Sequence, residues 1–430
     1  MSLSKAYRTY SNSAEPFSAD LKYSWMLAGI IFFLLASILG TAMRYYFIAE
    51  IPFLDYKHIL HAHSHVALLG WGYLFLSGAM LFLFLKRTSN RKVYFYILVA
   101  NIIAASGMAI FFLLQGYGPL SIGFSTVHLI TVYIFAWYFL KDLKHNETSA
   151  YVRFARWSII WLLISTIGLW AIAPVSIFLG KAHSLYYMSI QFFLHFQFNG
   201  WFTYGVLALL FFFISQNKKD IKIPNSGFWI LQFSLLLTYA LSVTWSTPIS
   251  VIFYLNSLGV LLQAVAFYLI FRPLFKGYNP FKSLGHWSDW LLVLGICCLF
   301  AKVIAQMAVA VPAIATISYT IRNYVIGFIH LVMLGSVTFT GVAILVKYKL
   351  LPLNTTSKAG WLILAAGFIS TELLLFGQGT LLWMRKGFIN YYYEIILAAT
   401  LLLPAGLATI LAGYRKLDFK PVQVINKSNV

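Results

Sequence analysis

Charged residues are scarce in this chain of 430 residues. Asp, Glu, Lys and Arg together make up 10% of it, whereas ordinary soluble proteins carry about 25%. Acidic residues are the rarest, because 11 Asp and Glu stand against 31 Lys and Arg, and the formal net charge is +20. A soluble domain this poor in charge would present a largely apolar surface to water. The composition therefore excludes an ordinary water-soluble enzyme or binding module.

Cysteine is almost absent as well. Cys297 and Cys298 are the two cysteines of the chain, and they are adjacent within an apolar segment, so the sequence has no disulfide framework and no CxxC metal motif. The basic excess does not indicate nucleic acid, since Lys and Arg lie in short clusters between apolar runs, as topology determinants do. We therefore expect the lipid bilayer, and no nucleic acid, as the principal surroundings.

Long apolar runs fill most of the chain. Hydrophobic residues make up 61% of it, and runs of about 18 or more, long enough to cross a bilayer as a helix, recur from end to end. We predict an all-α, polytopic membrane bundle in a single domain over residues 23–414, with tails at 1–22 and 415–430. The first apolar run is too long for a signal peptide and is expected to stay as a helix. The expected spans are 23–48, 59–85, 93–114, 119–141, 153–179, 183–214, 227–245, 249–271, 287–310, 321–346, 358–384 and 389–414.

The basic residues also predict the orientation of these twelve helices. Clusters such as Lys86 and Arg87, or Lys218 and Lys219, follow even-numbered helices, whereas connections after odd-numbered helices hold few basic residues. Because cytoplasmic loops are enriched in Lys and Arg, we expect both termini in the cytoplasm. The even number of helices agrees with this. We expect a multi-pass protein of a bacterial inner membrane.

Histidines are concentrated on the same side of the predicted bundle. Eight of the ten lie in, or at the outer end of, even-numbered helices, and a rise of 1.5 Å per residue places most of them in one layer of the outer half. Buried polar groups are costly in a membrane and normally face the bundle interior. A single one is most simply a hydrogen-bond partner between helices, but the set predicts ligation of a metal or heme. The eight are His58, His61, His63, His65, His128, His183, His195 and His330.

The second helix carries the densest group. At 100° per residue, His58, His61 and His65 share one face of the helix, and His63 points away. This helix can therefore offer ligands to two neighbouring centres. Imidazole suits Fe, Cu and Zn, and two histidines on facing helices can hold a heme iron between them.

With these residues in view, the chain resembles a known superfamily. Twelve helices with histidines on helices 2, 6 and 10 resemble subunit I of the heme–copper oxidases and nitric oxide reductases. The segments 61–63, 69–71 and 330–335 (HAH, LGW and HLVMLG) resemble most closely the NnrS-like membrane heme–copper proteins, which are associated with nitric oxide stress. The resemblance implies heme b, copper and the handling of electrons or of a small gas such as nitric oxide. It also implies an electron donor such as a quinol or a cytochrome.

The resemblance assigns roles to individual residues. It implies that one of His61, His63 or His65 pairs with His330 as the axial ligands of a low-spin heme b. Two basic residues between helices 11 and 12 stand where the family holds a basic pair near the heme propionates. Charge-assisted hydrogen bonds suit such a pairing, and a plain interfacial anchor is the alternative. These two residues are Arg385 and Lys386.

The copper ligands of the family are only partly present. The resemblance implies that His195 matches a copper ligand, but helix 7 ends with residues 243–245 (VTW) where the family has two adjacent histidines, and Asn199 replaces a tyrosine. A full dioxygen-reducing centre is therefore not expected, and whether the chain is an oxidoreductase stays open. His128 has no counterpart in the oxidases, and it is a candidate for a second metal site with His195 or His183.

Three further ionisable residues are candidates for buried, functional positions in the predicted helices. Glu372 lies in helix 11, Lys302 in helix 9 and Glu394 in the outer part of helix 12. Such residues are functional candidates by default. We expect them either to carry protons between the cytoplasm and the histidine layer or, in the case of Lys302 and Glu372, to form an ion pair.

Two other functions fit the same sequence. A proton-coupled secondary transporter of twelve helices could use histidines to bind substrate, but the prolines fall mostly at helix ends, and transporters usually have broken helices at mid-membrane. A non-catalytic membrane subunit of a respiratory assembly could hold heme as a structural or relay group. Substrate uptake and copurifying partner subunits, respectively, would distinguish these alternatives.

Overall fold

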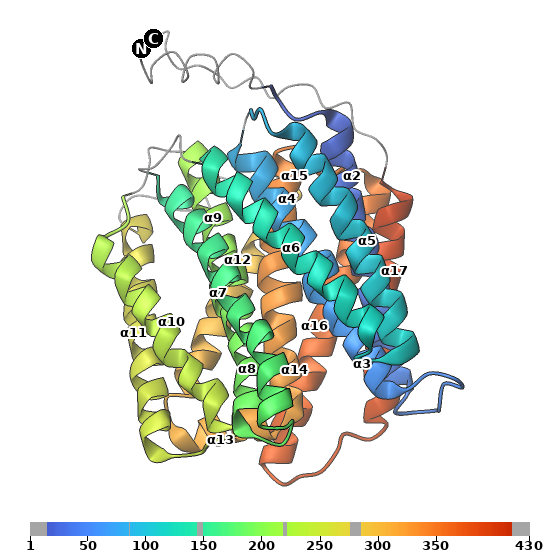
Figure 1. Ribbon diagram of the computed structural model, residues 1–430, viewed down its shortest axis with the longest axis vertical. Helices are drawn as coiled ribbons and strands as arrows, with labels where there is room; N and C mark the ends of the chain where they lie inside the picture. The colour runs from blue at the N-terminus through green and yellow to red at the C-terminus, as the bar shows by residue number, and fades with distance from the viewer. Residues whose placement is uncertain (1–14, 86, 144–148, 218–221, 276–284, 415–430) are drawn as a thin grey trace.

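The protein is a bundle of long helices. The computed structural model describes residues 15–85, 87–143, 149–217, 222–275 and 285–414, so most of the predicted tails lie outside the described residues. Within these ranges all secondary-structure elements are helices, apart from one isolated β-bridge. Twelve of the helices are long and apolar enough to cross a membrane. The predicted fold class of a polytopic helical bundle is confirmed (Figure 1).

The spans, numbered 1 to 12 along the chain, begin and end within a few residues of the predicted bounds. A short helix, α13 (Pro312–Thr320), precedes span 10 and was not expected. Spans 1 to 12 are α2 (Ala19–Tyr45), α3–η1–α4 (Tyr56–His65, Val66–Gly72, Tyr73–Phe84), α5 (Arg91–Gln115), α6 (Pro119–Asp142), α7 (Ala150–Phe178), α8–η3–α9 (Ser184–His195, Phe196–Phe202, Thr203–Asn217), α10 (Asn225–Thr244), α11 (Ser250–Phe275), α12 (Asp289–Ala308), α14–η5–α15 (Arg322–His330, Leu331–Phe339, Thr340–Lys347), α16 (Thr355–Trp383) and α17 (Tyr392–Ala412).

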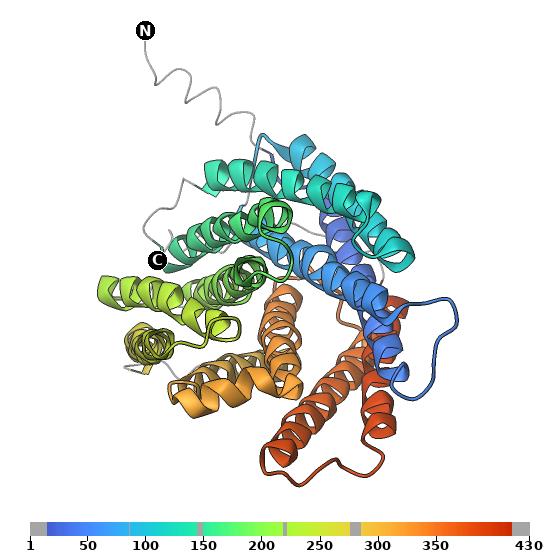
Figure 2. The ribbon, with the colours of Figure 1, turned by 60° about the horizontal axis from the view of Figure 1, so that its bottom comes forward.

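Three spans form the centre of the bundle. Spans 2, 6 and 10 are buried along 83–94% of their most apolar stretch, and the other nine along 33–50%. Seen with its lower end forward, the bundle has these three helices inside and the others around them (Figure 2). A helix that is apolar all round can be stable only in such a position or in lipid. Mean hydropathy does not distinguish these central spans from the outer ones, because the two sets overlap.

The twelve spans fall into three similar units of four. In each unit the first span packs along the π-helical part of the second: α2 on η1, α7 on η3 and α12 on η5. The third and fourth spans then form an antiparallel pair, which is α5 with α6, α10 with α11, and α16 with α17. The last unit closes on the first through contacts between α17 and α2. The chain therefore has an approximate threefold internal repeat.

The same repeat is visible in the sequence of the central spans. Each has an α-helical outer half that ends in a histidine, followed at once by a π-helical segment. These histidines are His65, His195 and His330, and a glycine follows each of them five residues later. At Gly200 an added Cβ would lie 2.6 Å from Cβ of Trp161, so the glycine is required for the close packing of α7 against η3. π-Helical segments are rare and often mark functional sites.

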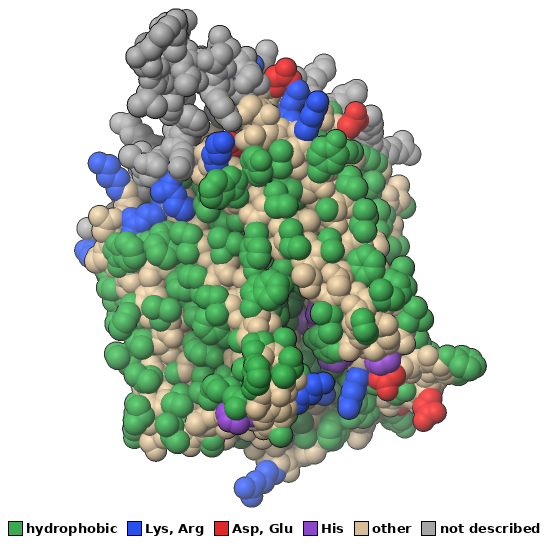
Figure 3. Space-filling view, in the orientation of Figure 1, with side chains coloured by type: hydrophobic (Ala, Val, Ile, Leu, Met, Phe, Trp, Pro, Cys, Tyr) green, Lys and Arg blue, Asp and Glu red, His purple; other side chains and the backbone are tan. Residues whose placement is uncertain are grey.

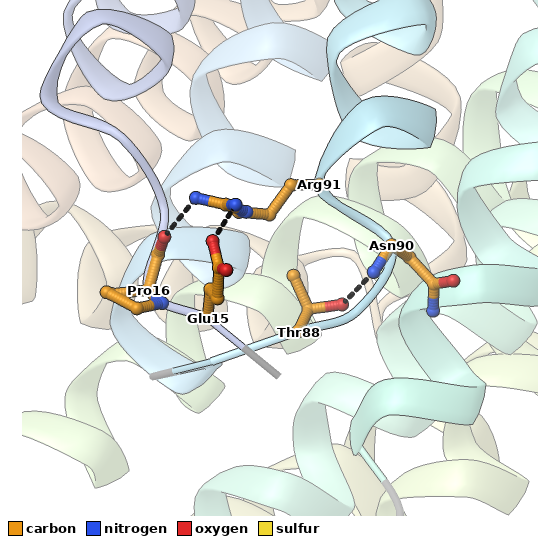
Figure 4. A network of polar contacts seen from close by, with 5 residues as sticks. All are labelled: Glu15, Pro16, Thr88, Asn90 and Arg91. Atoms are coloured by element: carbon orange, nitrogen blue, oxygen red, sulfur yellow. Dashed lines mark hydrogen bonds and ion pairs between the residues drawn. The ribbon is translucent and has the colours of Figure 1, made fainter. Parts of the chain in front are cut away.

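The end of the bundle that carries the chain termini is held by polar contacts. Glu15 and Thr88 form an isolated β-bridge, and Arg91 donates hydrogen bonds to the Glu15 carboxylate and the Pro16 carbonyl (Figure 4). Tyr414, the last described residue, packs its ring 5.0 Å from that of Tyr23. The first span thus begins, and the last span ends, on the same side of the bundle, as an even number of crossings requires.

The outer surface agrees with a position in lipid. Hydrophobic side chains cover the middle of the face in Figure 3, and Lys and Arg gather mainly toward its upper end. In the lower half, histidine side chains are visible, some of them inside a hollow of the surface. Since the described lower end carries fewer basic residues on this face, the arrangement agrees with the predicted orientation.

Candidate functional site

The histidines of the three central spans lie in three separate groups. His63 and His330 lie near each other, between spans 2 and 10. His61 and His65 face span 3, and His195 is hydrogen-bonded to span 7. The single layer expected from the sequence is therefore divided among the three units of the fold. In the described part of the chain, no three His, Cys, Asp or Glu side chains are arranged to hold a metal ion together.

The helix that carries four histidines starts at a strong cap. Asp55 is the N-cap of α3, and its Oδ1 accepts hydrogen bonds from the backbone N–H groups of Lys57 at 2.7 Å and His58 at 3.1 Å. These bonds stabilise the carboxylate and lower the pKa of Asp55 below its usual value. Capping of this kind fixes where the helix begins, and hence the directions in which its histidines point.

His63 points toward span 1, away from the other histidines of its helix, as its position in the sequence predicts. Its Nδ1 lies 2.8 Å from the carbonyl oxygen of Ala36. A carbonyl can only accept a hydrogen bond, so Nδ1 carries the proton and Nε2 holds the lone pair. Gly40 makes room for the ring, because an added Cβ there would lie 3.0 Å from Cε1 of His63. This is the arrangement that metal-binding histidines typically have.

His330 has a carboxylate as its neighbour. Its Nδ1 lies 3.7 Å from Oε1 of Glu372 in α16, which is too long for a hydrogen bond and short enough for an ion pair. Neither that Nδ1 nor either oxygen of Glu372 has a hydrogen-bond partner. Buried polar atoms without partners are uncommon, and a small approach of the two groups would satisfy both. His330 would then also present Nε2 as its free nitrogen.

Arg44 connects these groups electrostatically. It lies in the last turn of α2 and interacts with His63, His330 and Glu372. Arg44 is not among the site residues predicted from the sequence, because a basic residue in the last turn of a spanning helix is typically an interfacial one. This cluster of Arg44, His63, His330 and Glu372 is called the α3–α14 site below.

The other face of α3 carries a second group of rings. His61 packs edge-on to Tyr117 with centroids 4.5 Å apart, and His65 lies against Phe112 at 4.0 Å. Nδ1 of His65 donates to the carbonyl of His61 at 2.9 Å, so Nε2 of His65 is free of this bond. His128 interacts electrostatically with His65 and has an unpartnered Nδ1. The structure therefore relates His128 to His65 and not to His195 or His183.

His195, the predicted copper ligand, has both ring nitrogens in hydrogen bonds. Nε2 lies 2.9 Å from the carbonyl oxygen of Leu235, so this nitrogen carries the proton. The lone pair of Nδ1 then accepts from the amide of Asn199 at 3.3 Å. Asn199 in turn accepts from Gln306, and Gln306 accepts from Gln263 at 2.9 Å. A metal at His195 would have to displace Asn199, so the geometry does not favour the predicted copper site.

The remaining predicted site residues are dispersed. His183 caps α8, where its Nδ1 accepts from the N–H of Leu185 at 3.2 Å, and it is exposed. Arg385 and Lys386 are exposed in the connection between α16 and α17, and Glu394 is exposed in the first turn of α17. These positions fit interfacial roles.

The proposed ion pair between Lys302 and Glu372 is not formed. The ion-pair partner of Glu372 is His330, whereas Lys302 in α12 lies beside a small cavity that residues of spans 6, 7 and 8, such as Asn199, also line. The alternative that these two residues serve as a proton relay is left open by this separation. No sequence signal distinguished the two arrangements, because depth along a helix does not give its direction.

Comparison with known proteins adds no assignment. No protein-family model matches the chain, and no curated protein matches it either. The resemblance to the heme–copper superfamily therefore depends on the short motifs and the helix count given above, and the function must be argued from the site itself.

Proposed function

We propose that the protein is a membrane heme b protein that carries electrons, with His63 and His330 as the axial ligands of the iron. The observation that carries this proposal is that both imidazoles have a hydrogen-bond acceptor or a carboxylate next to Nδ1. Nδ1 of His63 is bonded to a backbone carbonyl and Nδ1 of His330 faces a carboxylate. Oriented in this way, both have Nε2 available to a metal.

The surroundings of the two histidines support heme more than a bare metal ion. Heme brings its own four nitrogen ligands, so two protein imidazoles suffice, whereas no group of three ligating side chains is present among the described residues. Heme also brings two propionates, and Arg44 supplies a positive charge next to His63 and His330. The outer halves α3 and α14 pack less extensively on one another than α14 does on α16, which would allow a flat group between them.

Each residue of the α3–α14 site has a distinct part in this proposal. The heme would supply an iron that takes up and releases one electron. The two imidazoles would hold and orient it, Glu372 would accept a hydrogen bond from Nδ1–H of His330 after a small approach of the two groups, and Arg44 would offset negative charge. If both imidazoles held the iron, no position on it would be left open for a gas such as nitric oxide, so we favour electron transfer. Copper is not part of the proposal, because the lone pair of His195 is already engaged.

The resemblance supplies the setting of the proposed function. We infer a place in a bacterial inner membrane, with electrons supplied by a quinol or a cytochrome. A respiratory partner subunit would accommodate the electron acceptor, since the described chain has one pair of imidazoles placed for heme.

The experiment is a reduced-minus-oxidised absorbance spectrum of the purified full chain after expression with sufficient heme. We expect a Soret band and the narrow visible bands of a low-spin heme b, with one heme extracted per chain. Metal analysis of the same sample should find iron and no stoichiometric copper. Absence of a Soret band under heme-replete expression would overturn the proposal.

A further inference from the structure

Lys302 is a buried charge that the proposed function does not use. It lies in α12, is 1% exposed, and forms no hydrogen bond or ion pair with a described residue. The two buried carboxylates of the described chain are engaged elsewhere: Glu372 lies at His330, and Asp289 accepts from the N–H groups of Gly285 and His286. Asp289 is thirteen residues away on the same helix, which corresponds to roughly 20 Å. Among the described residues, Lys302 therefore has no counter-charge.

A small cavity adjoins this side chain. About 10 Å³ of it is open to the centre of a water molecule, which is enough for about one water or an ion of similar size. Spans 6, 7, 8 and 9 line it, and none of these spans contributes a residue to the α3–α14 site. Besides Lys302 it is lined by Asn199, Thr203, Tyr204, Leu231, Ser234, Leu235, Thr238 and Gln263.

The polar groups of the wall differ in what they offer to an occupant. Thr203 donates its hydroxyl proton to the carbonyl of Phe198 at 2.7 Å, and Thr238 donates to the carbonyl of Ser234 at 3.0 Å. Their oxygens are therefore left to accept hydrogen bonds. The hydroxyl of Tyr204 is buried and has no partner. Free donors at this cavity thus come from Lys302, Tyr204 and the hydroxyl of Ser234, which has no hydrogen bond to a described residue. The threonine oxygens can accept further N–H groups of the ammonium.

We propose that this cavity binds a small inorganic monovalent anion, of the size of chloride, as the counter-ion of Lys302. An isolated ammonium is very unfavourable in a medium of low dielectric constant, and buried charges in proteins are paired. A metal cation is disfavoured because it would stand beside an ammonium group. A water molecule would satisfy the donors and leave the charge unpaired. An anion of one negative charge satisfies both requirements at once.

The site is tested by the dependence of thermal stability on chloride. Purified wild-type protein is unfolded in detergent while chloride replaces gluconate at constant ionic strength and pH. A ligand that binds only the folded state raises its stability in a saturable way, so we expect Tm to rise by a few degrees and then level off. In Lys302→Met the rise should disappear. Thr400→Val removes a buried hydroxyl of α17, away from the cavity, and should respond as the wild type does.

A direct measurement covers the case in which Lys302→Met does not fold. Bromide replaces chloride in crystals of the wild-type protein, and its anomalous scattering is expected as one peak beside Lys302. A Tm independent of chloride together with no bromide peak in the cavity would overturn the proposal, and so would a full chloride response in folded Lys302→Met. Heme content does not enter either readout, so this result and that of the proposed function are independent.

Discussion

The sixth span and the pair formed by the second and tenth spans carry histidines at comparable places in the repeat, but the nitrogens of these histidines are in different states. The protein occupies both nitrogens of His195, through Leu235 and Asn199. At His63 the protein occupies one nitrogen, and at His330 it places a carboxylate next to one. Burial alone therefore does not mark a ligand in a membrane protein. The direction of the lone pair and the group behind the ring distinguish a structural histidine from a candidate ligand.

The largest expected effect separates these two regions directly. His330→Ala removes a proposed axial ligand and should lower the heme content of the purified protein by more than about tenfold, since even changes behind a metal ligand cost 10–100-fold. His195→Ala removes an imidazole of the other region and should leave the heme content unchanged. Heme extracted per chain is the measurement. Equal losses in the two variants would contradict the distinction.

The carboxylate behind His330 gives the next effect. Glu372→Leu removes the acceptor for Nδ1 of His330 and should weaken heme retention by about 10–100-fold. Glu394→Leu is the matched control, because Glu394 is exposed in the first turn of α17. Heme transfer to an excess of apomyoglobin, followed by absorbance, measures the retention. Identical transfer rates in Glu372→Leu and the wild type would show that Glu372 does not support the ligand.

The glycines that follow the three histidines should differ in their tolerance of alanine. An added Cβ would lie 2.6 Å from Cβ of Trp161 at Gly200, and 3.2 Å from Cγ of Phe32 at Gly70. Overpacking costs about 1–3 kcal/mol, whereas alanine gains roughly 0.5–1 kcal/mol over glycine within a helix. Gly200→Ala should therefore destabilise the protein, and Gly70→Ala should be nearly neutral. Unfolding by denaturant measures both, and the reverse order would count against the close packing of α7 on η3.

The smallest effect concerns the cap of α3. The pKa of Asp55 is lowered in the folded protein by hydrogen bonds from Lys57 and His58. Its contribution to stability is therefore present above the ordinary carboxyl pKa of about 4, and it is lost as the pH falls through the lower folded-state value. The difference in Tm between the wild type and Asp55→Asn should shrink between pH 6 and pH 3. A difference that stays constant over this range would exclude the carboxylate as its source.

The sequence predicts the architecture well because a spanning helix has a strong and local signal. Apolar runs and basic clusters depend on composition over about 20 residues, and they located all twelve spans. The two faces of α3 also followed from the angle of 100° per residue, and the structure places His63 apart from His61 and His65 as expected. Composition and helical periodicity sufficed for these local features.

The arrangement of the site could not be obtained in the same way. Depth places Lys302 and Glu372 in one membrane layer, but it does not say which neighbouring helix each of them faces. In the structure Glu372 faces His330 of span 10, and Lys302 faces a cavity formed with spans 6, 7 and 8. Asn199 could be noted only as a departure from a family pattern, and its bond to His195 depends on a rotamer that no periodicity predicts. Arg44 was likewise inseparable from the other basic residues at helix ends.

Because of the π-helical segments, the side chains in the two halves of each central helix do not follow one continuous helical register. A π-helix bonds residue i to residue i+5, one residue further than the α-helix, so a uniform step of 100° does not carry across η1, η3 or η5. The inner halves α4, α9 and α15 are positioned by contact with one another. The direction in which each outer half points its histidine is therefore set by the helices packed around that outer half. Adding or removing a single residue within such a segment would therefore change the aim of the imidazole without requiring the rest of the bundle to repack.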